Sequence, residues 1–136
     1  MRNAILAIGS VWSVLFVGGC LGTTPRTTGG FVEFNELAAR PQRYNGSEIC
    51  TTGIYASGFE TSALGASTYE VDGAVYLSQP VIWVEGAEIR SKGECVKAGG
   101  MPQAEFCQVE VCGLFESGGG FGHLGGYEYQ LLASGE

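Results

Sequence analysis

Residues 107–112, Cys107-Gln108-Val109-Glu110-Val111-Cys112, alternate regularly between two kinds of side chain. In an extended strand Cys107, Val109 and Val111 face one way, and the residues between them face the other way. Alternation of this kind predicts a half-buried strand. The whole sequence contains 23 glycines and 11% aromatic residues, which favours short strands and turns over helices. We therefore predict an all-β domain.

Further strands are predicted on both sides of this stretch. Residues 48–55 suit a strand with Ile49, Thr51, Gly53 and Tyr55 on one face, and residues 59–64 either continue it past Gly58 or pair with it. Because Asp72-Gly73 is a hairpin signal, residues 68–71 and 74–77 are expected to pair. The nearly continuous apolar run at 80–84 predicts a strand that is covered on both sides.

The end of the chain predicts one more strand, and the start of the domain predicts a helix. Residues 127–132 form the last strand, with Tyr127, Tyr129 and Leu131 on one face, after a Gly-rich hairpin loop over 117–126. A short helix is expected over 34–41, and a turn at Asn45-Gly46 follows it. Asn35 is placed to cap the helix, Glu36 favours its first turn, and Pro41 discourages its continuation.

Several of these segments carry a family resemblance. The helix that ends in ARPQRYNG (39–46), the strand with Gly53 near its middle, and the pieces GFETSAL (58–64), IWVEG (82–86) and FGHLGGYEYQL (121–131) are similar to small OB-fold domains of exported bacterial proteins. The resemblance implies a five-stranded Greek-key barrel with a short N-terminal helix. It implies no activity, because that fold carries many functions.

The N-terminal segment indicates export. Residues 4–19, AILAIGSVWSVLFVGG, are uncharged and follow a single Arg, as in a signal peptide, and they are shorter than the roughly 20 residues of a transmembrane helix. The stretch Val17-Gly18-Gly19-Cys20 resembles the lipobox of bacterial lipoproteins, in which this cysteine receives the lipid. We therefore predict a signal peptide over 1–19, a flexible tether over 20–30 and one domain over 31–136. An ordinary secretory signal with an incidental cysteine is the alternative.

The resemblance to lipoproteins also implies an address. Leu21 follows the lipid-bearing cysteine, whereas aspartate at this position resembles the signal for retention at the inner membrane. The expected location is the outer membrane, with the lipid-anchored domain facing the periplasm. A palmitate-bearing cysteine with several acyl chains would hold the protein firmly there.

The charge of the chain excludes nucleic acid as a partner. Seven basic residues stand against 14 acidic ones, for a net charge of −7. Nucleic-acid binding draws most of its affinity from neutralised phosphates, which requires a basic surface. An anionic membrane surface is equally unfavourable, so attachment to the membrane is expected to come from the lipid alone.

Four cysteines remain besides Cys20, namely Cys50, Cys95, Cys107 and Cys112. An even number in an exported chain predicts disulfides, for which three pairings exist. Cys107 and Cys112 lie on opposite faces of one strand, so they should not bond each other. Cys95 and Cys107 bracket the irregular segment 86–106, which a disulfide would close. This favours Cys95–Cys107 together with Cys50–Cys112. A zinc site of four thiolates is the rival interpretation, and the absence of close cysteine pairs argues against it.

No catalytic or cofactor motif is convincing. Residues 120–125 match the letters of a dinucleotide-binding G-x-G-x-x-G segment, but a β-rich Tyr run follows where a helix is required. His123, the single histidine, could act beside Glu116 or Glu128, although a histidine that fixes the loop through hydrogen bonds is the favoured interpretation. Asp72 is the single aspartate. We therefore expect a non-enzymatic protein without a metal or cofactor.

An aromatic binding face is the remaining candidate site. Trp83, Tyr55, Phe59, Tyr69 and Tyr76 could form a stacking surface, although aromatic residues at strand spacing are more often part of the core. Trp83, Tyr55 and His123 are the candidate ligand-binding residues. The primary expectation is a lipid-anchored interaction module for a cell-envelope protein or glycan, and the alternative is a small-ligand or oligosaccharide binder that uses the open face and the Gly-rich loop.

Overall fold

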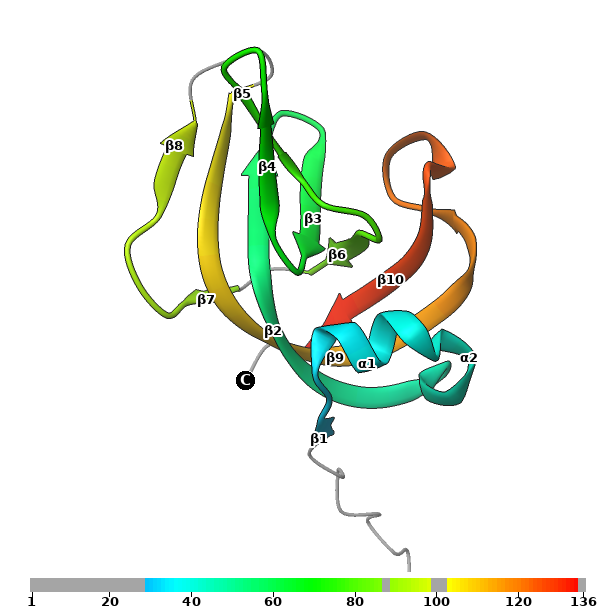
Figure 1. The fold of residues 1–136 in the computed structure, drawn as a ribbon. Helices are drawn as coiled ribbons and strands as arrows, with labels where there is room; N and C mark the ends of the chain where they lie inside the picture. The colour runs from blue at the N-terminus through cyan, green and yellow to red at the C-terminus, as the bar shows by residue number, and fades with distance from the viewer. Residues whose placement is uncertain (1–28, 87–88, 99–102, 135–136) are drawn as a thin grey trace, which may run out of the picture.

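The computed structural model describes residues 29–86, 89–98 and 103–134, and it is dominated by β-strands (Figure 1). The predicted signal peptide, Cys20 and most of the predicted tether lie outside the described residues. The elements are β1 (Gly30–Phe31), α1 (Phe34–Ala39), α2 (Pro41–Tyr44), β2 (Ser47–Gly58), β3 (Thr61–Gly65), β4 (Thr68–Val71), β5 (Ala74–Leu77), β6 (Ile82–Glu85), β7 (Arg90–Ser91), β8 (Val96–Ala98), β9 (Ala104–Phe121), the 3-10 helix η1 (His123–Gly125) and β10 (Tyr127–Ala133). The predicted all-β class is confirmed.

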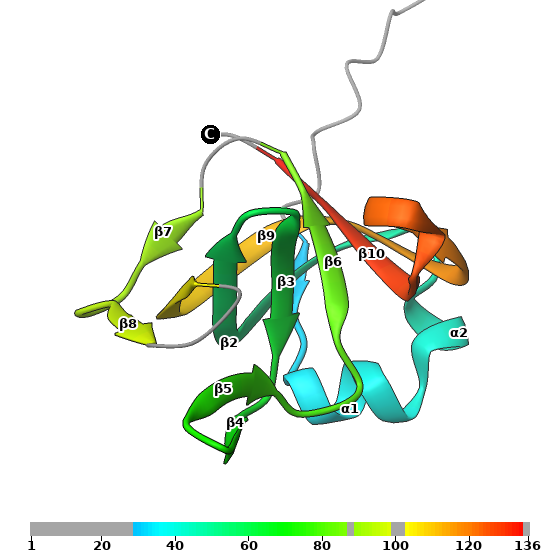
Figure 2. The same ribbon diagram turned by 90° about the horizontal axis from the view of Figure 1, so that it is seen from above.

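The strands form an eight-stranded sheet and a separate two-stranded one. Five strands of the larger sheet pair in a closed circuit, β2-β3-β6-β10-β9, because β9 returns to pair with β2. β6 and β10 are parallel, and the other neighbours in the circuit are antiparallel. β9 is the longest strand and also carries β7 and β8 on its first half. Figure 2 shows the circuit from above, with β4 and β5 extending beyond it.

The core lies inside the circuit. Ile49, Thr51 and Gly53 of β2 lie on one face as predicted; this face is buried, and it meets the buried alternate residues of β9. The remaining core side chains come from β3, β6, β10 and α1: Leu64, Ile82, Val84, Leu131, Phe34 and Leu37. Burying each large apolar side chain contributes roughly 1.5–3 kcal/mol. The helix is therefore part of the core and not an appendage.

Gly53 permits the close approach of β3 to β2. A Cβ at position 53 would lie 2.7 Å from the carbonyl oxygen of Gly65 and 3.1 Å from the Leu64 side chain. The strand β2 pairs with β9 along its whole length and with β3 from Ile54 onward. Gly53 therefore lies next to the residue of β2 at which the pairing with β3 begins, where the close approach leaves no room for a side chain.

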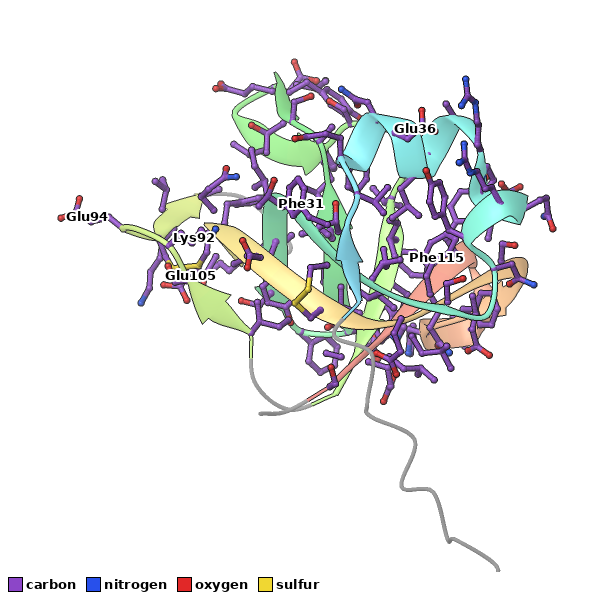
Figure 3. All side chains as sticks on the ribbon, turned by 90° about the horizontal axis from the view of Figure 1, so that it is seen from below. Phe31, Glu36, Lys92, Glu94, Glu105 and Phe115 are labelled. Carbon is purple, nitrogen blue, oxygen red and sulfur yellow. A yellow bond between two sulfur atoms is a disulfide. The ribbon has the colours of Figure 1, made fainter. Side chains whose placement is uncertain are left out.

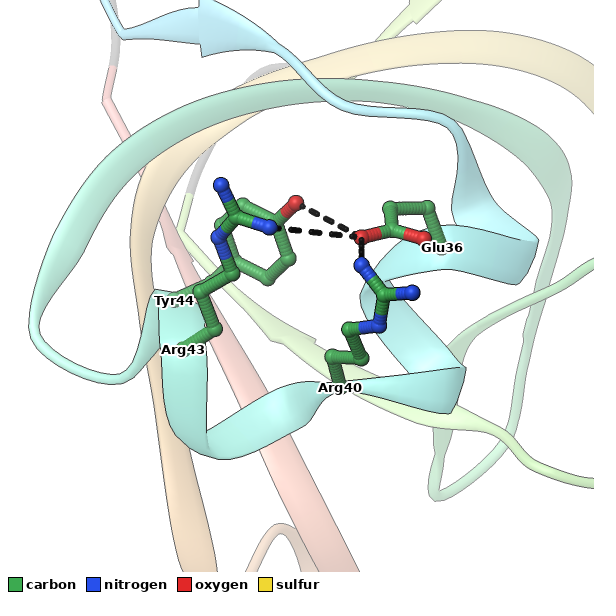
Figure 4. Close-up of polar contacts among 4 residues, drawn as sticks. All are labelled: Glu36, Arg40, Arg43 and Tyr44. Atoms are coloured by element: carbon green, nitrogen blue, oxygen red, sulfur yellow. Dashed lines mark hydrogen bonds and ion pairs between the residues drawn. The ribbon is translucent and has the colours of Figure 1, made fainter.

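The helical corner contains the predicted helix, but it differs from the prediction at the cap and in having a second short helix, α2. α1 ends at Ala39, before Pro41, which opens α2 as its first residue. The predicted cap was wrong: the N-cap is Glu33, without a side-chain cap bond, and Asn35 lies exposed within the first turn. Glu36 fastens the corner instead, because one of its carboxylate oxygens accepts hydrogen bonds from Arg40 at 3.1 Å and from the Tyr44 hydroxyl at 3.2 Å (Figure 4).

One open alternative is decided, and two further expectations need correction. Residues 59–60 form a turn, and β3 pairs with β2, which was one of the two predicted possibilities. β9 runs through most of the Gly-rich segment to Phe121, so the connection to β10 is shorter than the predicted loop. In β6 only Ile82 and Val84 are buried, while Trp83 is half-buried on the other face.

Candidate functional site

Two turns of the chain meet at one edge of the molecule. The β2–β3 turn carries Phe59 and Glu60, and the β9–β10 connection carries His123 and Leu124. Nε2 of His123 lies 3.3 Å from a carboxylate oxygen of Glu60. The sequence offered Glu116 or Glu128 as conceivable neighbours of His123 and favoured a histidine that fixes the loop; its carboxylate contact is Glu60, which the sequence did not indicate. The histidine joins two turns that are far apart in sequence.

Each turn contains a residue in the left-handed region of backbone space. Glu60 has φ 56° and Leu124 has φ 55°, a conformation that non-glycine residues adopt uncommonly. The apolar residues of the two turns also face solvent: the exposed fraction is 79% for Phe59 and 92% for Leu124. We call Phe59 and Leu124 the turn pair. Both side chains of the turn pair are exposed, so neither belongs to the core.

Trp83 lies next to the Gly-rich segment. Its ring centroid is 5.1 Å from that of Tyr127, and its indole N–H donates a hydrogen bond to Glu85 at 2.7 Å. A Cβ at Gly122 would lie 2.6 Å from the indole ring, and Gly122 has φ +67°. Only glycine therefore lets this segment pass over Trp83 without displacement.

Tyr55 does not share a face with Trp83. Tyr55 pairs with Leu64 and Trp83 pairs with Ala63, and neighbouring residues of β3 point to opposite sides of the sheet. The Tyr55 hydroxyl forms a 2.9 Å hydrogen bond with Ser62, which donates to the carbonyl of Val84. Of the three predicted ligand-binding residues, the structure brings together Trp83 and the His123 segment and leaves Tyr55 on the inner side.

A pocket of about 250 Å³ lies between the β4–β5 hairpin and the outer face of the sheet. We call it the hairpin pocket. Its side facing the sheet is lined by residues of β2, β3 and β9: the small Ala56, Thr61, Ala63 and Ala104, and the larger Phe106. Tyr69 and Tyr76 of the hairpin line it from the other side, with ring centroids 5.6 Å apart. A second hollow, which includes Lys97 and Glu105, shares Ala98 and Ala104 with it.

Tyr127 connects the hairpin pocket to the Trp83 region. It lines the pocket and contacts the Trp83 ring, and burial raises the pKa of its hydroxyl above the ordinary value. The predicted common face for Tyr127, Tyr129 and Leu131 was therefore wrong for Tyr127. The pairing of β9 with β10 shifts between Tyr127 and Tyr129, where the extra residues belong to β9, and an irregularity of this kind increases the local twist of the strand pair.

The four cysteines of the described domain form two disulfides, Cys50–Cys112 and Cys95–Cys107. These are the pairs that the sequence favoured. Cys50 and Cys112 are direct partners in the β2–β9 register. Cys95 and Cys107 lie opposite each other one residue beyond Val96 and Phe106, the end pair of the β8–β9 register. Figure 3 shows the bonded sulfurs as yellow links on the ribbon.

The disulfides remove the thiolates that a zinc site would need. Sulfur atoms of Cys95 and Cys107 lie near a Glu105 carboxylate, in a group with the composition of a metal site. The two sulfurs are bonded to each other, and metal coordination by cysteine requires the thiolate. Cys20, the predicted lipidation site, lies outside the described residues.

Sequence reasoning missed the hairpin pocket and the turn pair. Phe59, Tyr69 and Tyr76 were expected in the core, but their exposed fractions are 79%, 50% and 42%. The available signal was local: Tyr69 and Tyr76 stand opposite each other across the Asp72-Gly73 hairpin, and a two-stranded hairpin has too little area to bury both of its faces.

Within the ranges 29–86, 89–98 and 103–134, no helix is long and apolar enough to span a membrane. No protein-family model matches the chain, and neither curated proteins nor solved structures gave a match.

Proposed function

We propose that this chain is a lipid-anchored, non-enzymatic interaction module of the bacterial cell envelope, which docks an envelope protein through the turn pair, Phe59 and Leu124. The lipid is attached at Cys20, and the domain faces the periplasm from the outer membrane. The observation that carries the docking proposal is the exposure of two large apolar side chains on adjacent turns.

The strand circuit supports an OB-like Greek-key barrel as the scaffold. Among the five strands of the circuit, the first in sequence pairs with the fourth, and the third pairs in parallel with the fifth. A small five-stranded barrel of this kind presents its loops at one edge. The turn pair lies on two such loops, so a rigid scaffold would hold the docking residues in place.

Exposure and backbone geometry support a docking role for the turn pair. Leaving a Leu or Phe side chain in water forgoes roughly 1.5–3 kcal/mol of burial, and holding a non-glycine residue at positive φ costs about 1–3 kcal/mol. Leu124 combines both features. Buried apolar anchors dominate the energy of many protein interfaces, and a partner that covers this pair would recover the burial term.

The charge of the chain favours a protein partner over a lipid surface. The net charge is −7, and Glu60 stands beside Phe59 in the turn. An anionic membrane would repel this surface, whereas a protein cleft with an apolar floor and a basic rim would complement it. We therefore expect the partner to present basic side chains around an apolar cleft.

The disulfides support the proposed compartment. Two disulfides in a domain of this size are typical of exported proteins, since the cytosol keeps thiols reduced. The anchor is tested by metabolic labelling with a palmitate analogue: the wild-type chain should incorporate the label and fractionate with the outer membrane, and Cys20→Ser should abolish both. Label retained in the Cys20→Ser variant would contradict the anchor.

The docking proposal is tested by crosslinking in cells. A photo-crosslinking amino acid at position 124 should give one discrete protein adduct, and the Phe59→Asp substitution in the same chain should reduce its yield at least about tenfold. Val96→Asp is the matched control, because Val96 is also an exposed apolar residue but lies on β8. Adducts with lipid or glycan in place of protein, or an adduct that Val96→Asp reduces equally, would overturn the proposal.

A further inference from the structure

We propose that the hairpin pocket binds one uncharged sugar ring, with the ring held between the alanine side of the sheet and the tyrosine pair of the hairpin. This inference concerns residues outside the turn pair and does not depend on the proposed docking. It rests on the shape of the pocket, on the absence of charge from its described lining, and on the polar groups at its edge.

The shape of the pocket indicates a flat occupant. Ala56 and Ala63 belong to the lining but are almost completely covered by neighbouring atoms, with exposed fractions of 2%, whereas Ala104 and Phe106 of β9 are partly exposed. Tyr69 and Tyr76 lie on the hairpin side and remain about half exposed. Protein interiors normally close such a gap, since side chains pack to the density of organic crystals. An open space of about 250 Å³ between small side chains and aromatic rings can hold one ring but not an extended chain.

The described lining of the pocket contains no charged side chain. The chain as a whole has 21 charged residues (7 basic and 14 acidic), and those of the adjoining hollow, Lys97 and Glu105, do not line this one. A charged ligand would lose its hydration here without gaining an ion pair, which is strongly unfavourable. The occupant is therefore uncharged.

Several residues that line the pocket carry neutral hydrogen-bonding groups. The hydroxyls of Tyr69, Tyr76 and Tyr127 and the amide of Gln79 belong to lining residues. None of these groups forms a side-chain hydrogen bond with another described residue. A pocket that is mainly apolar and carries a few convergent polar groups is typical of a small-molecule site. A neutral sugar ring has an apolar C–H face for the tyrosines and hydroxyls at its rim for these partners.

The test is a titration of the isotope-labelled full chain, purified in a zwitterionic detergent and followed by two-dimensional NMR. The probes are methyl β-D-glucopyranoside, its uronate analogue with the same ring and one carboxylate, and cyclohexanol. We expect saturable shifts of the Ala56, Ala63 and Tyr76 amides with the glucoside, at a Kd of about 1 mM, and at least about tenfold weaker binding of the uronate and of cyclohexanol.

Two variants assign the binding to the pocket. Ala63→Leu places bulk on the sheet side, and Tyr76→Ala removes half of the aromatic pair, so each should weaken glucoside binding at least about tenfold. Ala39→Leu is the control, because Ala39 is an exposed residue of α1 outside the pocket. If Ala63→Leu does not fold, as judged by its amide spectrum, Tyr76→Ala decides, since its side chain is 42% exposed.

Three results would overturn the inference. They are equal affinity for the glucoside and the uronate, tighter binding of cyclohexanol than of the glucoside, and the absence of saturable shifts at the pocket amides. Chemical-shift changes confined to the amides of the turn pair would also overturn the inference, because the pocket amides would then be unaffected. The turn-pair variants leave the pocket intact. Failure of the sugar titration would therefore not affect the crosslinking result, and failure of the crosslinking would not affect the titration.

Discussion

At the scale of single residues, the least expected side chain is Thr51 in the core. It is fully buried in the middle of β2, and its hydroxyl has no hydrogen-bond partner among the described residues. A buried hydroxyl without a partner carries a desolvation penalty of about 1–3 kcal/mol. The sequence placed Thr51 on the same face as Ile49 and Gly53, because strand position decides which way a residue points, but it did not identify this face as the buried one.

Replacing Thr51 with Val should therefore stabilise the protein. The substitution keeps the shape of the side chain and removes the unpaired hydroxyl, so the free energy of unfolding should rise by about 1 kcal/mol. Chemical denaturation measures the change, with Thr52→Val as the control on the opposite, half-buried face. A loss of stability in Thr51→Val alone would mean that the hydroxyl is satisfied in solution.

Gly122 makes a second prediction at this scale. Gly122 and Gly120 both have positive φ, but a Cβ would approach the Trp83 ring only at position 122 and would find open space at position 120. Gly122→Ala should therefore lower the free energy of unfolding by about 1–3 kcal/mol more than Gly120→Ala does. The emission of Trp83 should change in the first variant only. Equal effects of the two substitutions would show that backbone strain alone matters.

At the scale of elements, β9 organises the domain. It pairs with β2, β7, β8 and β10 and is joined by a disulfide to β2 and by another to the segment before β8. The two disulfides close segments of very different length, with sequence separations of 62 and 12 residues. In the chain-entropy description, the longer segment gives the larger stabilisation.

Removing the disulfides separately should rank them. The Cys50→Ala/Cys112→Ala double variant should lose about 4 kcal/mol of unfolding free energy, and Cys95→Ala/Cys107→Ala about 3 kcal/mol. Urea titration of both variants and the wild type under non-reducing conditions gives the order. The reverse order would indicate that the short segment around β8 contributes through packing more than through chain entropy.

Elements defined by local chemistry were the ones the sequence predicted well. The Asp72-Gly73 hairpin has its predicted strands because positive φ at both turn positions selects these residues. The end of β9 was missed because glycines 118–120 lack strand propensity; they lie at the register shift without paired partners, and the strand resumes at Phe121, which pairs with Tyr127. The placement of Tyr127 was missed because a bulge depends on the partner strand, which no single stretch of sequence contains.

The candidate sites depend on contacts between distant segments. His123 was recognised as a loop residue, but its contact with Glu60 joins positions 63 residues apart in the chain. The hairpin pocket requires β2, β3, β9 and the β4–β5 hairpin to be assembled together. Composition and periodicity specify which residues are apolar, whereas the turn pair and the pocket arise where assembled elements leave apolar surface uncovered.

At the scale of the whole molecule, the charge is unbalanced. A net charge of −7 makes the folded state repel itself, while exposed ion pairs such as Arg40–Glu36 and Lys92–Glu110 contribute little each. Raising the salt concentration screens both the net repulsion and the ion pairs. We expect the loss of repulsion to outweigh the loss of ion-pair attraction. The Tm should therefore increase by a few degrees on going from about 0.01 M to about 0.15 M NaCl, where the screening length shortens from about 30 to about 8 Å. A lower Tm at the higher salt concentration would mean that the local ion pairs outweigh the net repulsion.

The short strand β1 gives the molecule a mechanical property. β1 has two residues and runs parallel to β2, with Phe31 beside Cys50, and the Val32 N–H donates a 2.8 Å hydrogen bond to the Cys50 carbonyl. Cys50 is in turn bonded to Cys112 of the long strand. Tension applied to the N-terminal end of the chain would first meet these few hydrogen bonds and then a covalently reinforced sheet. Under load, β1 would peel away as a short extension while the remainder of the domain kept its shape.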